Sequence, residues 1–247
     1  MSRSNPTSQI AHPCTTWFEW NGAHGALEYY DKKQEKRVRL PSPQFTFIYL
    51  DELYSVSGWH ERSKSGITSN EVRDSRTQAM AVKSFKGGLI AAGFYANIKD
   101  TVNAAGGYFS TNVYVAGKDG NGQLQIMSIR FAGAALNAWI EFSRKHHAEL
   151  HTMAVKITGF SEGRKGAVTF RIPQFQFEAV SQASNDQAVK LDLVLQEYLT
   201  EYFKKTASSS PSPHPAEAPQ PDAVEDHNQL PEPPPDLPVP PADDEPF

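Results

Sequence analysis

Aromatic residues and cations alternate at several places in the first half of the chain. The segment Tyr29–Arg39 combines two tyrosines with five cations, and further basic clusters follow Trp59 and surround Phe85. Single-stranded nucleic acid binds to this mixture, because cations follow the phosphates while aromatic faces stack on bases of any identity. The candidate contact residues are Tyr29, Tyr30, Lys32, Lys33, Lys36, Arg37, Arg39, Trp59, Arg62, Lys64, Arg73, Arg76, Lys83, Phe85 and Lys86.

Each of these residues also has a structural interpretation, since aromatic residues fill cores and Lys and Arg cover ordinary surfaces. The aromatic residues expected in the core are Phe45, Phe47, Tyr114, Trp139 and Phe170. The better stacking candidates lie beside cations in predicted loops or at their edges: Tyr29, Tyr30, Trp59 and Phe85. A further basic cluster at a later predicted hairpin holds Arg164, Lys165 and Arg171.

The chain lacks the motifs of common catalytic sites. It contains no Gly-x-x-x-x-Gly-Lys-Ser/Thr phosphate loop and no Gly-x-Ser-x-Gly nucleophile elbow. Asp51 and Glu52 are neighbours on a predicted strand, so their side chains are expected to point to opposite faces. His146, His147 and His151 do not follow the zinc pattern His-Glu-x-x-His, and a solvated helix end explains them. We therefore expect no enzyme activity, no metal and no cofactor.

Charge is divided unevenly along the chain. Residues Thr206–Phe247 include nine acidic residues, no Lys or Arg, and many prolines, a composition that cannot build a core. The preceding 205 residues hold the other 19 acidic residues and all 24 Lys and Arg, a net charge of +5. A basic body joined to an acidic segment indicates a polyanionic ligand for the body. We expect residues 206–247 to form a disordered, acidic, Pro-rich tail.

Residues 1–14 are expected to form a disordered lead that holds Cys14, the single cysteine of the chain. Residues 15–205 are long enough for one domain with a sizeable core. No apolar run approaches the ~20 residues of a membrane span, and the start of the chain lacks the apolar core of a signal peptide. These features predict a cytoplasmic protein without membrane contact.

Alternation of apolar and aromatic residues predicts a mainly β body. The predicted strands are Ala26–Tyr30, Gln44–Val56, Ile67–Val72, Met80–Ser84, Gly107–Ala116, Leu124–Phe131, Met153–Phe160 and Ala167–Phe177. Helical spacing predicts an inserted helix at Ala132–Ala148 and a C-terminal helix at Asp186–Lys205. This order favours an OB-fold-like β-barrel, although the pattern alone does not separate it from another barrel or a sandwich.

The segment Asp243, Asp244, Glu245, Pro246 and Phe247 combines three carboxylates with one aromatic ring. Such a tip suits capture by a basic pocket with an apolar floor. It resembles the acidic C-terminal end of bacterial and phage single-stranded DNA-binding proteins, which closes in Asp residues followed by Pro-Phe. Glu245 departs from the commonest bacterial form, in which an apolar residue precedes Pro-Phe. The body aligns with no motif of that family, so no DNA-contact residue is transferred from it.

The resemblance implies a phage-type single-stranded DNA-binding protein that acts in DNA replication, recombination or repair in the cytoplasm of a bacterial host. Its tip would recruit replication and recombination proteins, and the tail would compete with DNA for the basic body. The alternatives are a metal-dependent nuclease, a binder of duplex DNA or RNA, and a protein-only adaptor with an acidic tail. The oligomeric state and the preference for DNA over RNA stay open.

Overall fold

The computed structural model describes residues 11–42 and 44–209, with side chains up to residue 206. Its strands are β1 Thr16–Asn21, β2 Ala26–Asp31, β3 Lys36–Arg39, β4 Phe45–His60, β5 Ser65–Ser69, β6 Met80–Ser84, β7 Gly88–Gly93, β8 Gly107–Lys118, β9 Leu124–Ala132, β10 Ala154–Lys165 and β11 Val168–Glu178. The helices are the 3-10 turn Glu61–Ser63, α1 Tyr95–Ala104, α2 Gly133–Lys145, α3 His147–Leu150 and α4 Gln182–Ser209. The predicted tip Asp243–Phe247 lies outside the described residues.

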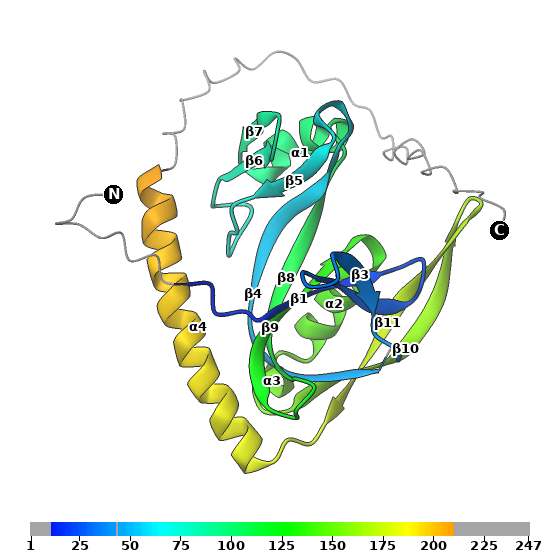
Figure 1. The fold of residues 1–247 in the computed structure, drawn as a ribbon, viewed down its shortest axis with the longest axis vertical. Helices are drawn as coiled ribbons and strands as arrows, with labels where there is room; N and C mark the ends of the chain where they lie inside the picture. The colour runs from blue at the N-terminus through cyan, green and yellow to red at the C-terminus, as the bar shows by residue number, and fades with distance from the viewer. Residues whose placement is uncertain (1–10, 43, 210–247) are drawn as a thin grey trace, which may run out of the picture. The chain divides into compact units, whose positions relative to one another are not determined.

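Strand β4 organises the sheet, because its two ends have different neighbours along one edge. Residues 45–48 pair with β10, residues 57–60 pair with β5, and β8 pairs with almost the whole opposite edge. The sheet continues from β8 through β9, β1 and β2 to β3, and from β5 through β6 to β7. Only the β1–β9 pairing is parallel among the described strands. The result is an open mixed sheet that forks along β4 (Figure 1).

The sheet curls without forming the ladder that would close a barrel. Among the described residues, β11 pairs only with β10, and the β1–β2 turn meets β11 through separate hydrogen bonds. The amide of Arg171 donates to the carbonyl of Gly22 at 2.8 Å, and Trp20 Nε1 donates to the carbonyl of Arg171 at 2.8 Å. The mainly β class and the closing helix are therefore confirmed, whereas strand pairing does not complete a barrel.

Alternation along β8 assigns the two faces of the sheet, since neighbouring residues of a strand point to opposite sides. Val113 and Val115 pack in a core with Trp139 of α2, whereas Tyr114 packs in a second core with Leu195 and Leu199 of α4. Helices α2 and α4 thus cover opposite faces (Figure 1). A third core joins β5, β6 and α1 at the other branch of the fork.

Helix α4 is longer than predicted at both ends. It begins at Gln182 rather than Asp186, because the hydroxyl of Ser181 accepts a hydrogen bond from the amide of Ser184 and caps the first turn. It ends at Ser209, so residues 206–209 belong to the helix and not to the predicted tail.

Cys14 is another difference from the sequence-based expectation, which placed it in a disordered lead. Its side chain is buried in the core that Leu53 of β4 shares with α4, and the loss of water raises the pKa of its thiol. The reason is tertiary: residues 11–15 run between the sheet and α4, where the amide of Thr15 donates to the carbonyl of Ile126.

Two leucines of α4 allow its docking to be tested. Leu195 is fully buried against the sheet, whereas Leu193 is 66% exposed. We expect Leu195→Ala to lower the free energy of unfolding by about 2–5 kcal/mol and Leu193→Ala to change it by less than about 0.5 kcal/mol. Urea unfolding followed by circular dichroism measures both. Because the two changes alter helix propensity equally, similar losses would contradict the observed packing of α4.

Candidate nucleic-acid interface

Exposed aromatic side chains gather on the sheet face that α4 only partly covers. Trp17 is 45% exposed, Tyr30 58%, Trp59 54%, Phe85 74% and Tyr108 39%. Large contiguous apolar surface is uncommon on a soluble protein and marks an interaction site. We call this side of the sheet the outer face, and its composition follows from the strand register.

Residues that are partners across neighbouring strands point to the same side of a sheet. Trp17 is paired with Ser128 of β9, which is paired with Tyr114, the residue of β8 that packs against α4. The same rule, applied to successive pairs, places on the outer face Trp17, Glu19, Glu28, Tyr30, Arg37, Arg39, Ser55, Ser57, Trp59, Lys83, Tyr108, Ser110, Asn112, Ser128 and Arg130.

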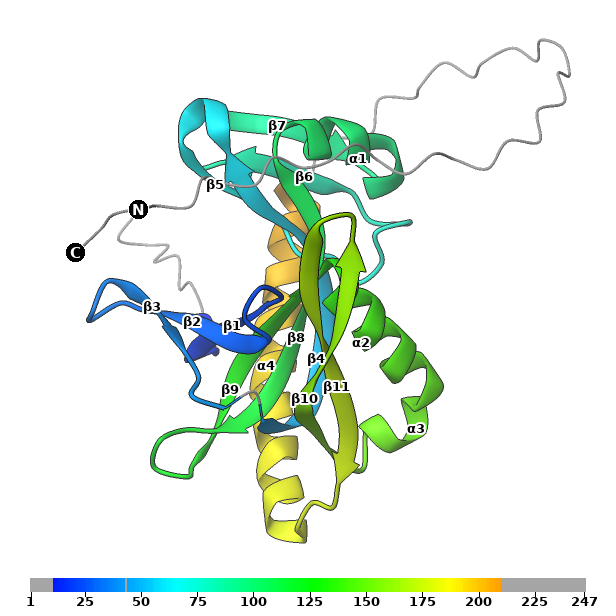
Figure 2. The same ribbon diagram turned by 90° about the vertical axis from the view of Figure 1, so that its right-hand side faces the viewer.

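Phe85 joins this face from the β6–β7 turn. Its amide donates to the carbonyl of Gly66, and its ring lies where a Cβ atom on Gly66 would project. Gly66 is the partner of Trp59 across the β4–β5 pairing, so the two exposed rings belong to one side. The β4–β5 turn and strands β2 and β3 project toward the same side of the molecule (Figure 2).

The first group of contacts surrounds Glu19 of β1. Its carboxylate accepts from Arg37 Nη1 at 3.0 Å and from the hydroxyl of Tyr108 at 3.1 Å. Burial and the nearby carboxylate raise the pKa of Tyr108 to about 12, so its hydroxyl stays a donor at neutral pH. Lys32 Nζ lies 5.8 Å from the ring centroid of Trp17, within the range of a cation–π contact. The group therefore links β1, β3 and β8.

Beside it, Glu28 holds Arg39 and His24. Arg39 Nε donates to the carboxylate at 3.1 Å, and His24 Nδ1 lies 3.2 Å from it. Burial opposes ionisation of Glu28, but hydrogen bonds from Asn21 and Arg39 outweigh burial and lower its pKa. The carboxylate is thus ionised at neutral pH and neutralises part of the charge of Arg39.

A second group surrounds Trp59 and Phe85. The hydroxyl of Ser63 lies 2.9 Å from that of Ser65 and 3.3 Å from that of Ser84, and the amide of Lys86 donates to Ser65 at 3.1 Å. These bonds tie the β4–β5 turn to the β6–β7 turn, so the turn that carries Phe85 is held against Trp59. Lys83 and Lys86 flank Phe85 and are exposed.

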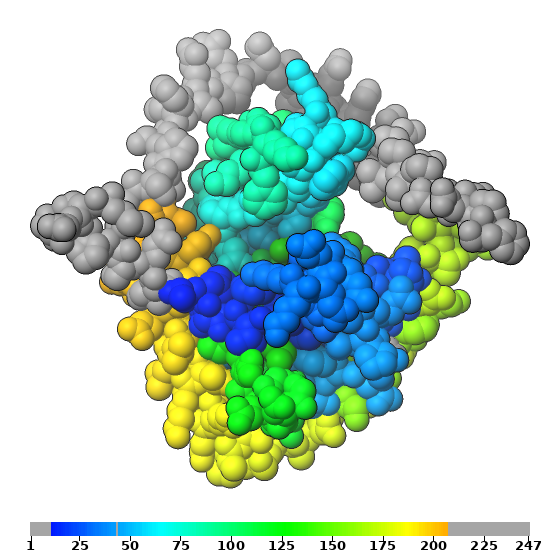
Figure 3. All heavy atoms as spheres, viewed as in Figure 1, coloured from blue at the N-terminus to red at the C-terminus, as the bar shows by residue number. Residues whose placement is uncertain are grey.

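Between the two groups the outer face has a polar floor. Asn112 Nδ2 donates to Ser55 at 3.1 Å, and Arg130 Nε donates to Asn112 at 3.2 Å. Tyr114 donates to the carboxylate of Glu71 at 2.6 Å, and Asn112 donates to the same group. In the space-filling view the surface is recessed between the β4–β7 part and strands β1–β3 (Figure 3).

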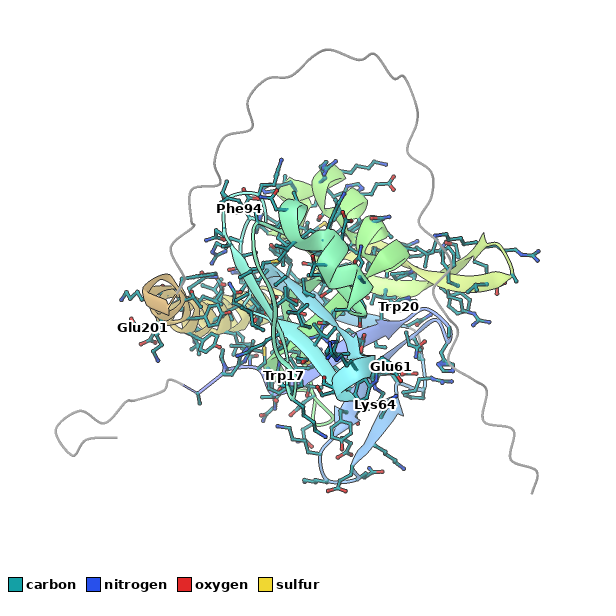
Figure 4. The ribbon with its side chains drawn as sticks, turned by 90° about the horizontal axis from the view of Figure 1, so that it is seen from above. Trp17, Trp20, Glu61, Lys64, Phe94 and Glu201 are labelled. Carbon is teal, nitrogen blue, oxygen red and sulfur yellow. The ribbon has the colours of Figure 1, made fainter. Side chains whose placement is uncertain are left out.

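Many of the sequence-predicted residues come together at this face. The residues that lie on it are Tyr30, Arg37, Arg39, Trp59, Lys83 and Phe85. Lys32 lies beside it, over the ring of Trp17. Others occupy the turns after β2, β4 and β6: Lys33, Arg62, Lys64 and Lys86. Trp17, Glu61 and Lys64 lie toward one side of the molecule in the view from above, and Phe94 toward the other (Figure 4).

Four predicted contact residues have other positions. Tyr29 packs in the core, with its ring centroid 5.5 Å from that of Phe18. Arg73 pairs with Asp51 at 2.9 Å and lies over the ring of Phe203, which fastens α4 to the sheet. Arg76 pairs with Asp74 in a turn, and Lys36 lies on the opposite side of β3 from Arg37.

Trp17, Tyr108 and Arg130 belong to the outer face but were not predicted. The segment Thr16–Asn21 alternates Trp17 and Glu19 with Phe18 and Trp20, a signal that identifies a half-buried strand. Tyr108 and Arg130 have no comparable local signal, because only the pairing of β8 with β4 and β9 brings them to this side.

The prediction that Asp51 and Glu52 point to opposite faces is confirmed. Asp51 accepts from Gln196 of α4 at 2.9 Å, and Glu52 accepts from Trp139 Nε1 of α2 at 2.7 Å. The two carboxylates therefore each brace a different helix, and their geometry is unsuited to a shared acid–base site.

Glu71 links the polar floor to α4 and has a testable pH signature. Burial raises its pKa, although hydrogen bonds from Tyr114 and Asn112 act in the opposite direction. A carboxyl with a raised pKa destabilises the folded state as pH rises from its unfolded value near 4.5 through the folded value. We expect the melting temperature of the wild type, relative to Glu71→Gln, to fall over this interval. A difference that does not change with pH would contradict the raised pKa.

The described residues show neither a metal-ligand cluster nor a membrane-spanning helix. Within residues 11–42 and 44–209, no three His, Cys, Asp or Glu side chains are grouped to hold a metal ion. No described helix is both long and apolar enough to cross a membrane. Comparison of the chain with protein-family models, curated proteins and solved structures finds no match. The outer face, with its exposed aromatic residues and cations, is therefore the candidate binding site.

Proposed function

We propose that the chain binds single-stranded DNA without sequence preference through the outer face, and acts in phage DNA replication, recombination or repair. The observation that carries the proposal is the gathering of five exposed aromatic rings and several cations on one side of one sheet. Tyr30 and Trp17 mark one end of this row, Tyr108 its middle, and Trp59 and Phe85 the other end.

The form of the surface favours an extended, flexible ligand. The rings come from β1, β2, β4, β8 and the β6–β7 turn, so a ligand that contacts them all must cross several strands. Unstacked bases offer their faces to such rings, whereas a duplex keeps base faces stacked inside. Stacking on each ring contributes about 1–3 kcal/mol and tolerates any base.

The charge of this surface supports the same ligand. Lys83 and Lys86 flank Phe85, and Lys32 lies beside Trp17, so phosphates that connect stacked bases would find cations near both ends of the row. Arg37 and Arg39 already face Glu19 and Glu28, which reduces their attraction for phosphate. We therefore expect the lysines to supply most of the salt-dependent affinity.

The proposal includes an OB-like fold for the branch of the sheet that surrounds the core under α2. The hydrogen bonds that join Gly22 and Trp20 to Arg171 bring the two ends of a curled sheet together around the core under α2. OB-folds are partly open barrels that bind oligonucleotides across strands of their surface. On this proposal, strands β5–β7 on the second branch would be an addition to such a barrel.

The acidic segment Asp243–Phe247 completes the proposal as a recruiting element for replication and recombination proteins. Its residue types, three carboxylates with one Pro-Phe pair, suit a basic pocket with an apolar floor. The nine acidic residues after position 205 would also compete with DNA for the basic body at low salt.

A matched pair of phenylalanines tests the outer face. Phe85 lies on it beside Trp59, whereas Phe94 lies at the start of α1 and is also exposed. We expect Phe85→Ala to weaken binding of labelled oligo-dT by about 1–3 kcal/mol, which is roughly 5- to 150-fold in Kd. Phe94→Ala should leave Kd unchanged. Fluorescence anisotropy titrations with oligo-dT, oligo-rA and a duplex, at two salt concentrations, measure these affinities.

The same titrations separate the alternatives. Equal affinity for duplex would indicate a duplex binder, and no affinity for any nucleic acid would indicate a protein-only adaptor. Cleavage of the oligonucleotide when magnesium is added would indicate a nuclease. Each of these three outcomes contradicts the proposed function.

Removal of residues 210–247 tests the role of the acidic tail while keeping α4 intact. We expect the truncated chain to bind oligo-dT more tightly than the full chain at low salt, and this difference to shrink at high salt because the competition is electrostatic. A full-length variant with Asn and Gln in place of the acidic residues of this segment is the control for length. Weaker binding by the truncated chain would contradict the competition.

A further inference from the structure

The β10–β11 hairpin extends beyond the sheet as a two-stranded arm. Residues 154–157 of β10 pair with both β4 and β11, but the register shifts between Ile157 and Gly159, and the following residues pair only with β11. We call residues 159–174 the arm (Figures 1 and 2). An isolated two-stranded hairpin is at best marginally stable in water, so the arm depends on contacts with neighbouring segments.

Those contacts fix the middle of the arm, at Arg171, to the β1–β2 turn. Besides the two backbone-carbonyl bonds of Gly22 and Arg171 described above, the guanidinium of Arg171 donates to the carbonyl of Ala23. The same guanidinium lies 5.3 Å from the ring centroid of Phe160, and Gly25 leaves room for both side chains. The arm is thus oriented by the strands that carry Trp17 and Tyr30.

The tip of the arm is basic and exposed. Arg164 and Lys165 are exposed and have no carboxylate partner among the described residues, and Val168 is 53% exposed. Arg164 Nε donates to the carbonyl of Gly166 at 3.0 Å, which holds its guanidinium at the turn. The only acidic residue of the arm, Glu162, pairs with Arg171 midway along it. The arm therefore presents unneutralised charge at its tip.

A chain of contacts leads from the outer face to the arm. Arg39 and His24 share the carboxylate of Glu28, and His24 follows Ala23, whose carbonyl accepts from Arg171. A polyanion that follows β1 from Trp17 to the β1–β2 turn would next meet Arg171 and the arm.

We infer that the arm binds a further stretch of the same single strand, through phosphate contacts of Arg164 and Lys165. The inference rests on the proposed function and extends it, because it assigns a second binding element that is held against the β1–β2 turn. A strand long enough to cover the outer face and the β1–β2 turn would gain these contacts, whereas a short strand held by the stacking rings would not.

The test uses the full chain and a pair of matched double variants. Arg164→Ala with Lys165→Ala removes the Arg-Lys pair of the arm, and Arg144→Ala with Lys145→Ala removes an exposed Arg-Lys pair at the end of α2. Both lose the same charge. Thermal unfolding checks that each variant folds, and oligo-dT strands of increasing length are titrated at several salt concentrations.

We expect the arm variant to match the wild type on the shortest strands that bind and to lose affinity on longer ones. Its plot of log K against log salt should be shallower by about 1.4, because each phosphate contact with a single strand contributes about 0.7 to the slope. The α2 variant should keep the slope and length dependence of the wild type.

Failure of this inference is distinguishable from failure of the proposed function. If the wild type binds no single strand, the proposed function itself fails. If it binds and the arm variant equals the α2 variant at every length, the arm takes no part. Equal loss on short and long strands, or loss confined to duplex, would also overturn the assignment of the arm to a longer single strand.

Discussion

The antiparallel ladder between β4 and β8 is the constraint on which the rest of the fold depends. Eleven residue pairs, broken by one register shift, join the two strands, and the branches of the sheet extend from different ends of β4. Because side chains alternate on either side of this shift, the ladder also divides the molecule into two faces. One face packs against α2. The other face packs against α4 near one end of the ladder and is left uncovered by α4 near the opposite end.

This division explains how a polar floor and exposed rings coexist on a stable sheet. The face under α2 is filled by Trp139, Phe131 and Val115, so apolar burial there suffices to stabilise the central strands. The opposite face can then carry Ser55, Ser110 and Asn112, whose polar groups bond to one another. No buried polar side-chain atom in the described part of the chain is without a hydrogen-bond partner. Ser55, Ser110 and Asn112 are themselves buried, so these hydrogen bonds satisfy polar groups that have lost contact with water.

Local sequence patterns predicted the elements whose periodicity is strong. Met80–Ser84 was predicted with the observed bounds, and the predicted positions of β2, β8, β9 and β11 differ from those observed by at most two residues at either end. The prediction missed α1, which buries only Ile98 and Val102, and β3, in which three of four residues are exposed and which pairs with β2 alone. It also missed β1, although that strand alternates and buries Phe18 and Trp20. Cys14 was misplaced because its burial depends on α4, far away in the chain.

Composition by itself determined that a basic, aromatic-rich β body precedes an acidic, Pro-rich segment, because charge and hydrophobicity are properties of residues regardless of their positions. Tertiary structure decided which of those residues share a surface. Trp59 of β4 and Tyr30 of β2 face the same side because the pairings through β8, β9 and β1 carry the alternation across the sheet. Tyr29 and Arg73 also lie near cations and aromatic residues in the sequence. In the structure, however, Tyr29 packs in the core and Arg73 pairs with Asp51 beside α4. Strand register, which is set by contacts between distant residues, is the physical reason for that choice.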